Sequence, residues 1–148
     1  KKTEPGPQKA EEKILDCEGQ ETHLCEWCGW QIKSRVFVAD QVPQEASEKV
    51  YTKWFDYDII RDAVSIRTRK PGDYLAIHSD GKTQKLKSYF INEKIPAKSR
   101  ERILLIAEGH QILWVVGYRM SSRYQISEHT KRIIEIKIME DKKHGRDN

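Results

Sequence analysis

The sequence predicts a β-rich α+β fold, a compact layered β-sandwich-like domain with one or two short helices. Side chains branched at Cβ dominate the apolar positions, with 16 Ile and 7 Val against 7 Leu and 7 Ala. Such side chains pack well on pleated sheets and are mildly unfavourable in helices. Short apolar runs separated by turn signals recur along the chain, and only one stretch has a clear helical period. A chain of 148 residues is expected to form a single domain.

The two ends of the chain are expected to lie outside the folded domain. Residues 1–12 contain two Pro, one Gly and a single apolar side chain, which is too little to offset the entropy of ordering, so we expect a disordered linker. Residues 140–148 contain no apolar side chain and predict a disordered tail. The domain is therefore expected to span residues 13–139. The chain begins without Met, as expected of a piece of a longer protein.

Alternation of apolar and polar residues predicts the strands. The clearest strand is the last, where Ile134, Ile136 and Ile138 alternate with Glu135 and Lys137, which places an apolar face inward and a charged face outward. Turn signals rich in Gly, Pro and Asp separate the earlier runs. In chain order, the other predicted strands are Trp30–Val38, Val50–Phe55, Ala63–Thr68, Tyr74–Ile77, Ile103–Ala107 and Gln111–Val116.

The helical period occurs at Gln84–Asn92. At 100° per residue, Leu86, Tyr89 and Phe90 fall within about a third of the circumference, which predicts a short amphipathic helix with one apolar face. Pro96 can begin a second helical turn, because proline is well placed at the first helical position. That turn is expected over Ala97–Arg102.

Composition excludes several functional classes. No apolar run approaches the roughly 18 residues that a membrane helix needs, so we expect no membrane partner. Three cysteines are too few, and odd in number, for a disulfide framework, so a cytoplasmic location is expected. The glycines form neither a Walker loop nor a dinucleotide fingerprint, and no G-x-S-x-G motif is present. We therefore expect no catalytic residue in this chain.

Positive charge is concentrated in the middle of the chain. The formal net charge is +4, yet residues 61–102 carry 11 Lys/Arg and 5 Asp/Glu, a net of +6. A concentrated cationic surface attracts a polyanion by releasing its condensed counterions, which makes nucleic acid the leading partner. Arg67 and Arg69 fall on the same face of a predicted strand, and a guanidinium group can form two parallel hydrogen bonds with a phosphate. The alternative, that the lysine-rich stretch is only a solvated surface, remains open.

A C-x-x-C pair, Cys25 and Cys28, has the spacing of metal ligands. With Cys17 and His23 upstream, it can supply the four ligands of a zinc site. The same segment also has the pattern of a β-hairpin around Gly29, in which the cysteines are small apolar side chains. We prefer the hairpin and expect no metal ligands, and the zinc site is kept as an alternative.

Three segments in the basic middle and after it carry a family resemblance. They are Val64–Asp73, Gln84–Pro96 and Ile112–Ser121, with Arg100 between the second and the third. Together they closely resemble the C-terminal domain of the tRNA(Ile)-lysidine synthase family, in a match that extends over residues 50–139. The resemblance implies a β-rich layered fold related to a domain of the phenylalanyl-tRNA synthetase β subunit.

The resemblance also implies a function. In this family the complete enzyme is an ATP-dependent ligase that joins lysine to the wobble cytidine of an isoleucine tRNA. ATP and lysine are used by a separate N-terminal catalytic domain with an S-G-G-x-D-S loop, which this sequence does not contain. No cofactor is therefore expected in this chain, and two partners are: that catalytic domain and the acceptor stem of the tRNA. A homodimer is left open.

The tRNA-binding residues follow from carrying the family pattern onto this sequence. A double-stranded acceptor stem is held mainly through its phosphates, so basic side chains are the expected contacts. Asp73 is expected to cap a turn and not to contact RNA. The expected contact residues are Arg67, Arg69, Lys85, Lys87, Lys94, Arg100 and Arg119.

A second function stays open beside this one, that of a non-catalytic interaction module which packs against the catalytic domain or a partner subunit. Trp27, Trp30 and Trp54 motivate it, because aromatic side chains left outside a small core mark protein interfaces.

Overall fold

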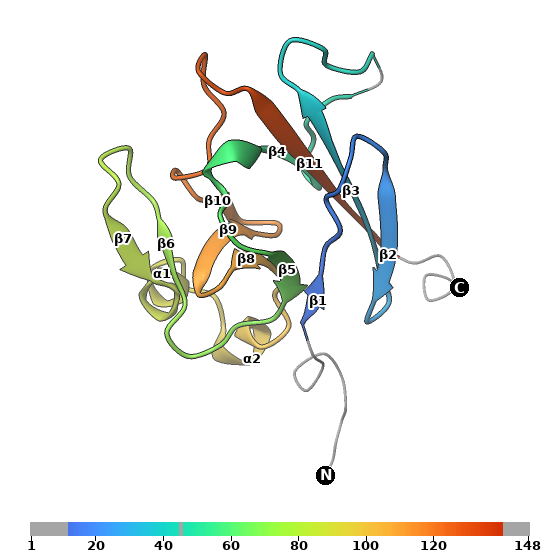
Figure 1. The fold of residues 1–148 in the computed structure, drawn as a ribbon. Coiled ribbons are helices and arrows are strands. Elements are labelled where there is room, and N and C mark those ends of the chain that lie inside the picture. The colour runs from blue at the N-terminus through green and yellow to red at the C-terminus, as the bar shows by residue number, and fades with distance from the viewer. Residues whose placement is uncertain (1–11, 45, 141–148) are drawn as a thin grey trace. The chain divides into compact units, whose positions relative to one another are not determined.

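The computed structural model describes residues 12–44 and 46–140, and these residues form two compact units (Figure 1). Of the described residues, unit 1 contains those up to Ile14 and the segment Arg61–Tyr124. Unit 2 contains the described residues of Leu15–Ile60 and those from Gln125 to Glu140. The predicted domain 13–139 therefore includes both units. Apart from Glu12 and Glu140, the predicted linker 1–12 and tail 140–148 lie outside the described residues.

Unit 1 is built on a sheet with the strand order β1-β5-β8-β9-β6-β7, in which the short strand β10 also pairs with β9. The pairs are antiparallel except for the parallel contact between β6 and β9. Two short helices, α1 and α2, connect β7 to β8. The elements are β1 (Lys13–Ile14), β5 (Val64–Arg67), β6 (Tyr74–Ala76), β7 (Thr83–Lys85), α1 (Leu86–Asn92), α2 (Ala97–Arg100), β8 (Leu105–Glu108), β9 (Gln111–Val115) and β10 (Arg119–Met120).

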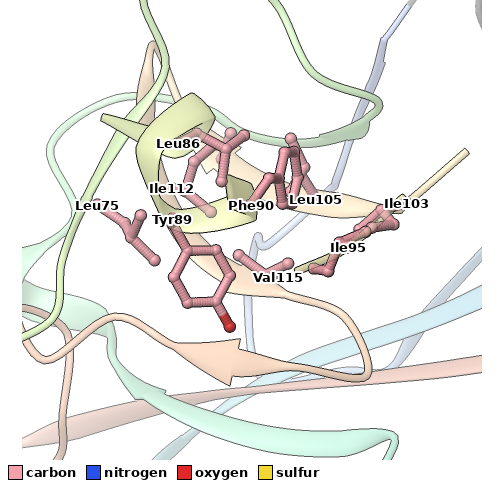
Figure 2. Packing of buried hydrophobic residues seen from close by; sticks show 10 residues of the cluster. Leu75, Leu86, Tyr89, Phe90, Ile95, Ile103, Leu105, Ile112 and Val115 are labelled. Carbon is pink, nitrogen blue, oxygen red and sulfur yellow. The ribbon is translucent and has the colours of Figure 1, made fainter. Parts of the chain in front are cut away.

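The core of unit 1 confirms the predicted amphipathic helix. Leu86, Tyr89 and Phe90 extend from α1 into a buried cluster that also contains Leu75 of β6 and Leu105 of β8 (Figure 2). Burial of these side chains is the main favourable term that holds α1 to the sheet. The helix begins two residues after the predicted start, at Leu86, because the residues before it pair with β6 as strand β7.

Unit 2 is an antiparallel sheet with the strand order β2-β3-β11-β4. Its predicted apolar face is present: Ile134, Ile136 and Ile138 of β11 are buried, and Ile138 lies opposite Ile32 of β3. A turn of 3-10 helix follows the edge strand. The elements are β2 (His23–Trp27), β3 (Trp30–Val38), β4 (Thr52–Asp56), η2 (Tyr57–Ile59) and β11 (Arg132–Glu140).

The strand predictions are confirmed, with ends that differ from the observed ones by no more than two residues. The preferred hairpin is also present, since β2 and β3 are joined at Cys28 and Gly29, which both have positive φ angles of 51° and 86°. Two successive positive φ angles are typical of the tight turns whose twist matches the flanking strands. The short strands β1, β7 and β10 carry too few residues for alternation to be recognised.

The charged face predicted for the last strand is wrong at Glu135. This side chain is buried, whereas Lys137 is exposed as expected. One oxygen of Glu135 accepts a hydrogen bond from Arg35 Nε at 2.9 Å, and the other accepts one from Trp54 Nε1 at 2.8 Å. A carboxylate can be buried when its charge and lone pairs are satisfied in this way.

None of the three tryptophans that motivate an interaction module is fully exposed on unit 2. Trp27 is buried, and Trp30 and Trp54 are half-buried. Trp54 packs edge-on against Phe37, with 5.6 Å between ring centroids. The expectation that these side chains remain outside the core is wrong for Trp27, whereas Trp30 and Trp54 do not belong to the buried core.

Candidate nucleic-acid interface

A cationic groove with a volume of about 810 Å³ lies within unit 1. Three segments line it: the turn after β5, the junction of β7 with α1, and the end of α2. Its two acidic residues are Asp73 and Glu101. Its basic residues are Arg69, Lys70, Lys85, Lys87 and Arg100.

The first wall of the groove is a tight turn formed by Lys70, Pro71, Gly72 and Asp73. The turn is closed by a hydrogen bond from Asp73 N to Lys70 O at 3.3 Å, and Gly72 has a φ of +91°. Proline followed by a residue of positive φ is the pattern of a type II turn, in which glycine is strongly preferred. This geometry places Arg69 and Lys70 at the edge of the groove.

Arg67 lies beneath this turn and not on the surface, so its expected role as a phosphate contact is wrong. The residue is 2% exposed. Its two terminal nitrogens donate to the two carboxylate oxygens of Asp73, both at 2.9 Å, and also to the carbonyls of Thr68 and Gly109. The bidentate pair removes Arg67 from the set of groups that can contact RNA.

Asp73 caps the turn through its hydrogen bonds, as the sequence predicts. It is 3% exposed, and in addition to the two bonds from Arg67 it accepts a hydrogen bond from the backbone N–H of Lys70 at 2.7 Å. His110 Nδ1 lies 3.2 Å from its other oxygen. Because the carboxylate is satisfied by buried protein groups, Asp73 is a structural residue of the groove.

Arg69 reaches the groove already paired with a carboxylate. Its Nε and Nη2 atoms donate to one oxygen of Glu101 at 2.9 and 2.6 Å, and its guanidinium lies 5.9 Å from the centroid of the Phe90 ring. The side chains of Arg69 and Glu101 are 30% and 52% exposed. Pairs this exposed are worth little in water, so a phosphate can replace Glu101.

Lys85 and Lys87 project into the groove on either side of Leu86, whose side chain is buried. Both lysines are exposed, and within residues 12–44 and 46–140 neither forms an ion pair. The amphipathic start of α1 explains their direction, since the apolar residue points into the core and its neighbours point away from it. These two lysines are the most available positive charges of the groove.

The remaining predicted contacts are divided. Arg100 lines the groove, and its Nε donates to the carbonyl of Ile95 at 2.9 Å. Lys94, which has a φ of 59°, and Arg119 of β10 are exposed and do not line it. The structure therefore brings four of the seven predicted residues to one groove: Arg69, Lys85, Lys87 and Arg100.

Lys70 and Tyr74 line the groove, although neither is among the contacts predicted from the sequence. Lys70 belongs to the same basic run as Arg69, which is the signal that could have identified it, and its Nζ lies 2.8 Å from Glu12. Tyr74 lines the groove with a half-buried ring that can contact a ribose or a base.

The zinc alternative finds no support in the geometry. Within the described residues no three His, Cys, Asp or Glu side chains are placed to hold a metal ion. His23 makes other contacts, with Nε2 2.7 Å from the Glu18 carbonyl, and this hydrogen bond raises the pKa of His23. Burial, with a smaller contribution from the Asp16 carboxylate, raises the pKa of the Cys17 thiol to about 11.

The high pKa of Cys17 predicts slow alkylation. At pH 8 only about a thousandth of this side chain is the reactive thiolate. Iodoacetamide at pH 8 is therefore expected to modify Cys17 in the folded protein far more slowly than in urea, as measured by mass spectrometry of the peptides. Equal rates in the two conditions would contradict the burial of this thiol.

The comparison with protein families decides which family the chain belongs to. The family described as TilS substrate C-terminal domain matches residues 64–137, which is half of the chain. The chain belongs to this family. The match contains every residue of the groove, from Arg69 to Glu101.

Curated relatives carry one name. A tRNA(Ile)-lysidine synthase of Caldanaerobacter subterraneus subsp. tengcongensis is 40% identical over 91 residues, which are 62% of this chain and 20% of that protein. A tRNA(Ile)-lysidine synthase of Clostridium tetani is 36% identical over 112 residues, which are 75% of this chain and 24% of that protein. The chain thus spans about a fifth to a quarter of the length of these relatives.

The fold has a counterpart among solved structures. The structure described as "Crystal structure of TILS C-terminal domain" matches with a TM-score of 0.66 and 23% sequence identity, over 89% of this chain and 98% of that one. The predicted β-rich fold with short helices is confirmed by this likeness and by the two sheets. Within the described residues, no helix is long and apolar enough to cross a membrane.

Proposed function

We propose that this chain is the tRNA-binding C-terminal domain of a tRNA(Ile)-lysidine synthase. It binds the acceptor stem of an isoleucine tRNA, while a separate N-terminal catalytic domain uses ATP to join lysine to the wobble cytidine through a new carbon–nitrogen bond. The family assignment and the name of the curated relatives support the proposal that the chain is part of this enzyme. The cationic groove of unit 1 supports the binding of RNA. ATP and lysine are substrates of the catalytic domain and do not enter the groove.

The groove suits the backbone of an RNA duplex. An A-form stem exposes its phosphates and a shallow minor groove edged by 2′-hydroxyl groups, and proteins recognise it mostly by shape and charge. Lys85 and Lys87 act as mobile point charges for phosphates, whereas Arg69 offers a planar fork. Tyr74 and Thr83 supply polar groups for the ribose.

One observation carries the proposal: Lys85 and Lys87, the available cations, share a groove with Arg69 and Arg100, which come from distant parts of the chain. Lys94 and Arg119 lie outside that groove. They act at longer range, as part of the positive field that attracts RNA.

Binding to RNA fragments in a salt series tests the proposed function. We expect the isoleucine tRNA and an acceptor-stem minihelix to bind with similar affinity, and the anticodon stem-loop to bind no better than an unrelated hairpin. The logarithm of the affinity is expected to fall linearly with log[salt], with a slope of about −0.7 to −0.9 for each neutralised phosphate. Absence of binding, or equal affinity for the anticodon stem-loop, would overturn the proposal.

Glu101 is predicted to weaken the binding of RNA. It neutralises Arg69 and places a negative charge in the groove, so Glu101→Gln is expected to tighten tRNA binding about two- to fivefold, as loss of an exposed pair worth about 0.5–1 kcal/mol implies. Glu93→Gln is the matched control, because it makes the same change of charge at an exposed position outside the groove. If the two variants change the affinity in filter binding equally, Glu101 acts only through the net charge of the protein and not through its position in the groove.

A further inference from the structure

Unit 2 carries a second cationic hollow, with a volume of about 320 Å³. It lies on one face of the sheet, beside the loop between β3 and β4, and it shares no residue with the groove of unit 1. Three hydroxyl side chains line it, from Thr22, Ser47 and Thr52. Its charged residues are Lys33, Arg35, Lys49, Glu135 and Lys137.

The strand register forces two of these lysines together. Lys33 of β3 lies directly opposite Lys137 of β11, on the face of the sheet away from the buried pair of Ile32 and Ile138. Side chains directly opposite in an antiparallel pair have Cβ atoms about 4.5–5.5 Å apart, and like charges there destabilise the sheet. The pair is therefore unfavourable unless an anion lies between the two ammonium groups.

The carboxylate in the hollow does not serve as that anion. Both oxygens of Glu135 accept hydrogen bonds, one from Arg35 Nε at 2.9 Å and one from Trp54 Nε1 at 2.8 Å. Its side chain is 10% exposed, so the Arg35–Glu135 pair is a fixed part of the wall. Among the described residues, Lys33, Lys49 and Lys137 form no ion pair, and Glu135 is the only acidic residue lining the hollow.

We propose that this hollow binds a phosphate group. Lys33 and Lys137 supply positive charge from the two strands that line the hollow, and Lys49 supplies it from the loop. Thr52 supplies a hydroxyl donor. A phosphate anion here relieves the cross-strand repulsion and accepts several charge-assisted hydrogen bonds. The inference does not depend on the proposed function. The phosphate can belong to an RNA backbone or be a free anion, and the chemistry of recognition is the same.

If the hollow binds phosphate, the two lysines should lower the melting temperature in chloride and raise it in phosphate. Two lysines with no ligand would not show this opposite dependence on the anion. In chloride, Lys33→Gln with Lys137→Gln removes the repulsion and is expected to raise the melting temperature. In inorganic phosphate at the same ionic strength, the wild-type chain is expected to gain stability by mass action, and the variant is expected to lose this gain. The matched control is Lys53→Gln with Lys131→Gln, which removes the same charge from unit 2 outside the hollow.

Titrations followed by NMR identify the source of the phosphate. Inorganic phosphate is expected to shift the amide signals near Lys33 and Lys137, with an affinity roughly tenfold weaker in the double variant, whereas the control binds like the wild type. A short RNA duplex that shifts the same signals would make the backbone the source, and shifts with inorganic phosphate alone would make it a free anion. Either result supports the site.

The proposal is overturned if neither inorganic phosphate nor the duplex shifts these signals, or if the control and the double variant respond alike. Lys85→Glu with Lys87→Glu separates the site from the groove of unit 1. That variant is expected to keep the phosphate response of unit 2 whether or not the groove binds tRNA.

Discussion

Reversal of the two groove lysines, with Lys85→Glu and Lys87→Glu combined, is expected to weaken tRNA binding at least about tenfold at moderate salt. Both lysines line the groove, and within the described residues neither is neutralised by a carboxylate. Each should neutralise one phosphate, so the salt slope of the variant should be shallower by about 1.4–1.8. Filter binding with the isoleucine tRNA at several salt concentrations measures both quantities.

The matched control makes the same change of charge outside the groove. Lys98 and Arg102 are exposed in the same basic segment but do not line the groove. Lys98→Glu with Arg102→Glu is expected to weaken binding by less than about threefold, through the long-range field alone. If the control weakens binding as much as the groove variant, RNA is attracted by diffuse charge and the groove has no special role.

Asp73→Asn is expected to destabilise the protein by about 3–5 kcal/mol, because the buried guanidinium of Arg67 loses its bidentate counter-charge and keeps only the partly exposed Glu12 carboxylate, 3.7 Å from its Nε. The pair is bidentate, with both distances at 2.9 Å, and both side chains are at most 3% exposed. Such a loss is a large fraction of the roughly 5–15 kcal/mol that stabilises a typical domain. Urea unfolding followed by circular dichroism measures the change in the free energy of unfolding.

His110→Ala is the control for this prediction. His110 contacts the same carboxylate at 3.2 Å, but its side chain is 57% exposed. Its removal is expected to cost less than about 1 kcal/mol, because Asp73 keeps its bonds to Arg67 and Lys70. A small effect of Asp73→Asn, within 1 kcal/mol of the wild type, would show that the turn is held by other contacts.

The fold could be predicted where a local pattern determines burial. Ile134, Ile136 and Ile138 alternate with polar residues and form the buried face of β11, and Leu86 and Phe90 mark the buried face of α1. In both places burial depends on side-chain polarity at a fixed period, which the sequence displays directly. The division into two units has no such signal, since unit 2 is completed by pairing β3 with β11, far apart in the chain.

The sequence could predict which region of the chain is basic, but not which of its cations are free to contact RNA. The net charge of +6 over residues 61–102 identifies the basic region that contains the groove. Whether a given cation is available depends on distant partners: Arg67 donates to Gly109, and Arg69 pairs with Glu101. Glu135 is buried for the same reason, because Arg35 lies opposite it in the sheet. No local pattern reveals pairs that form only when the strands assemble.

The groove can be tested directly by mapping where RNA binds. An acceptor-stem minihelix added to isotopically labelled protein is expected to shift the NMR signals of the turn at residues 69–74 and of the β7–α1 junction at residues 83–87, with Arg100 at the third wall. Shifts absent from these segments while the minihelix binds elsewhere on the chain would contradict the groove as the site of tRNA contact.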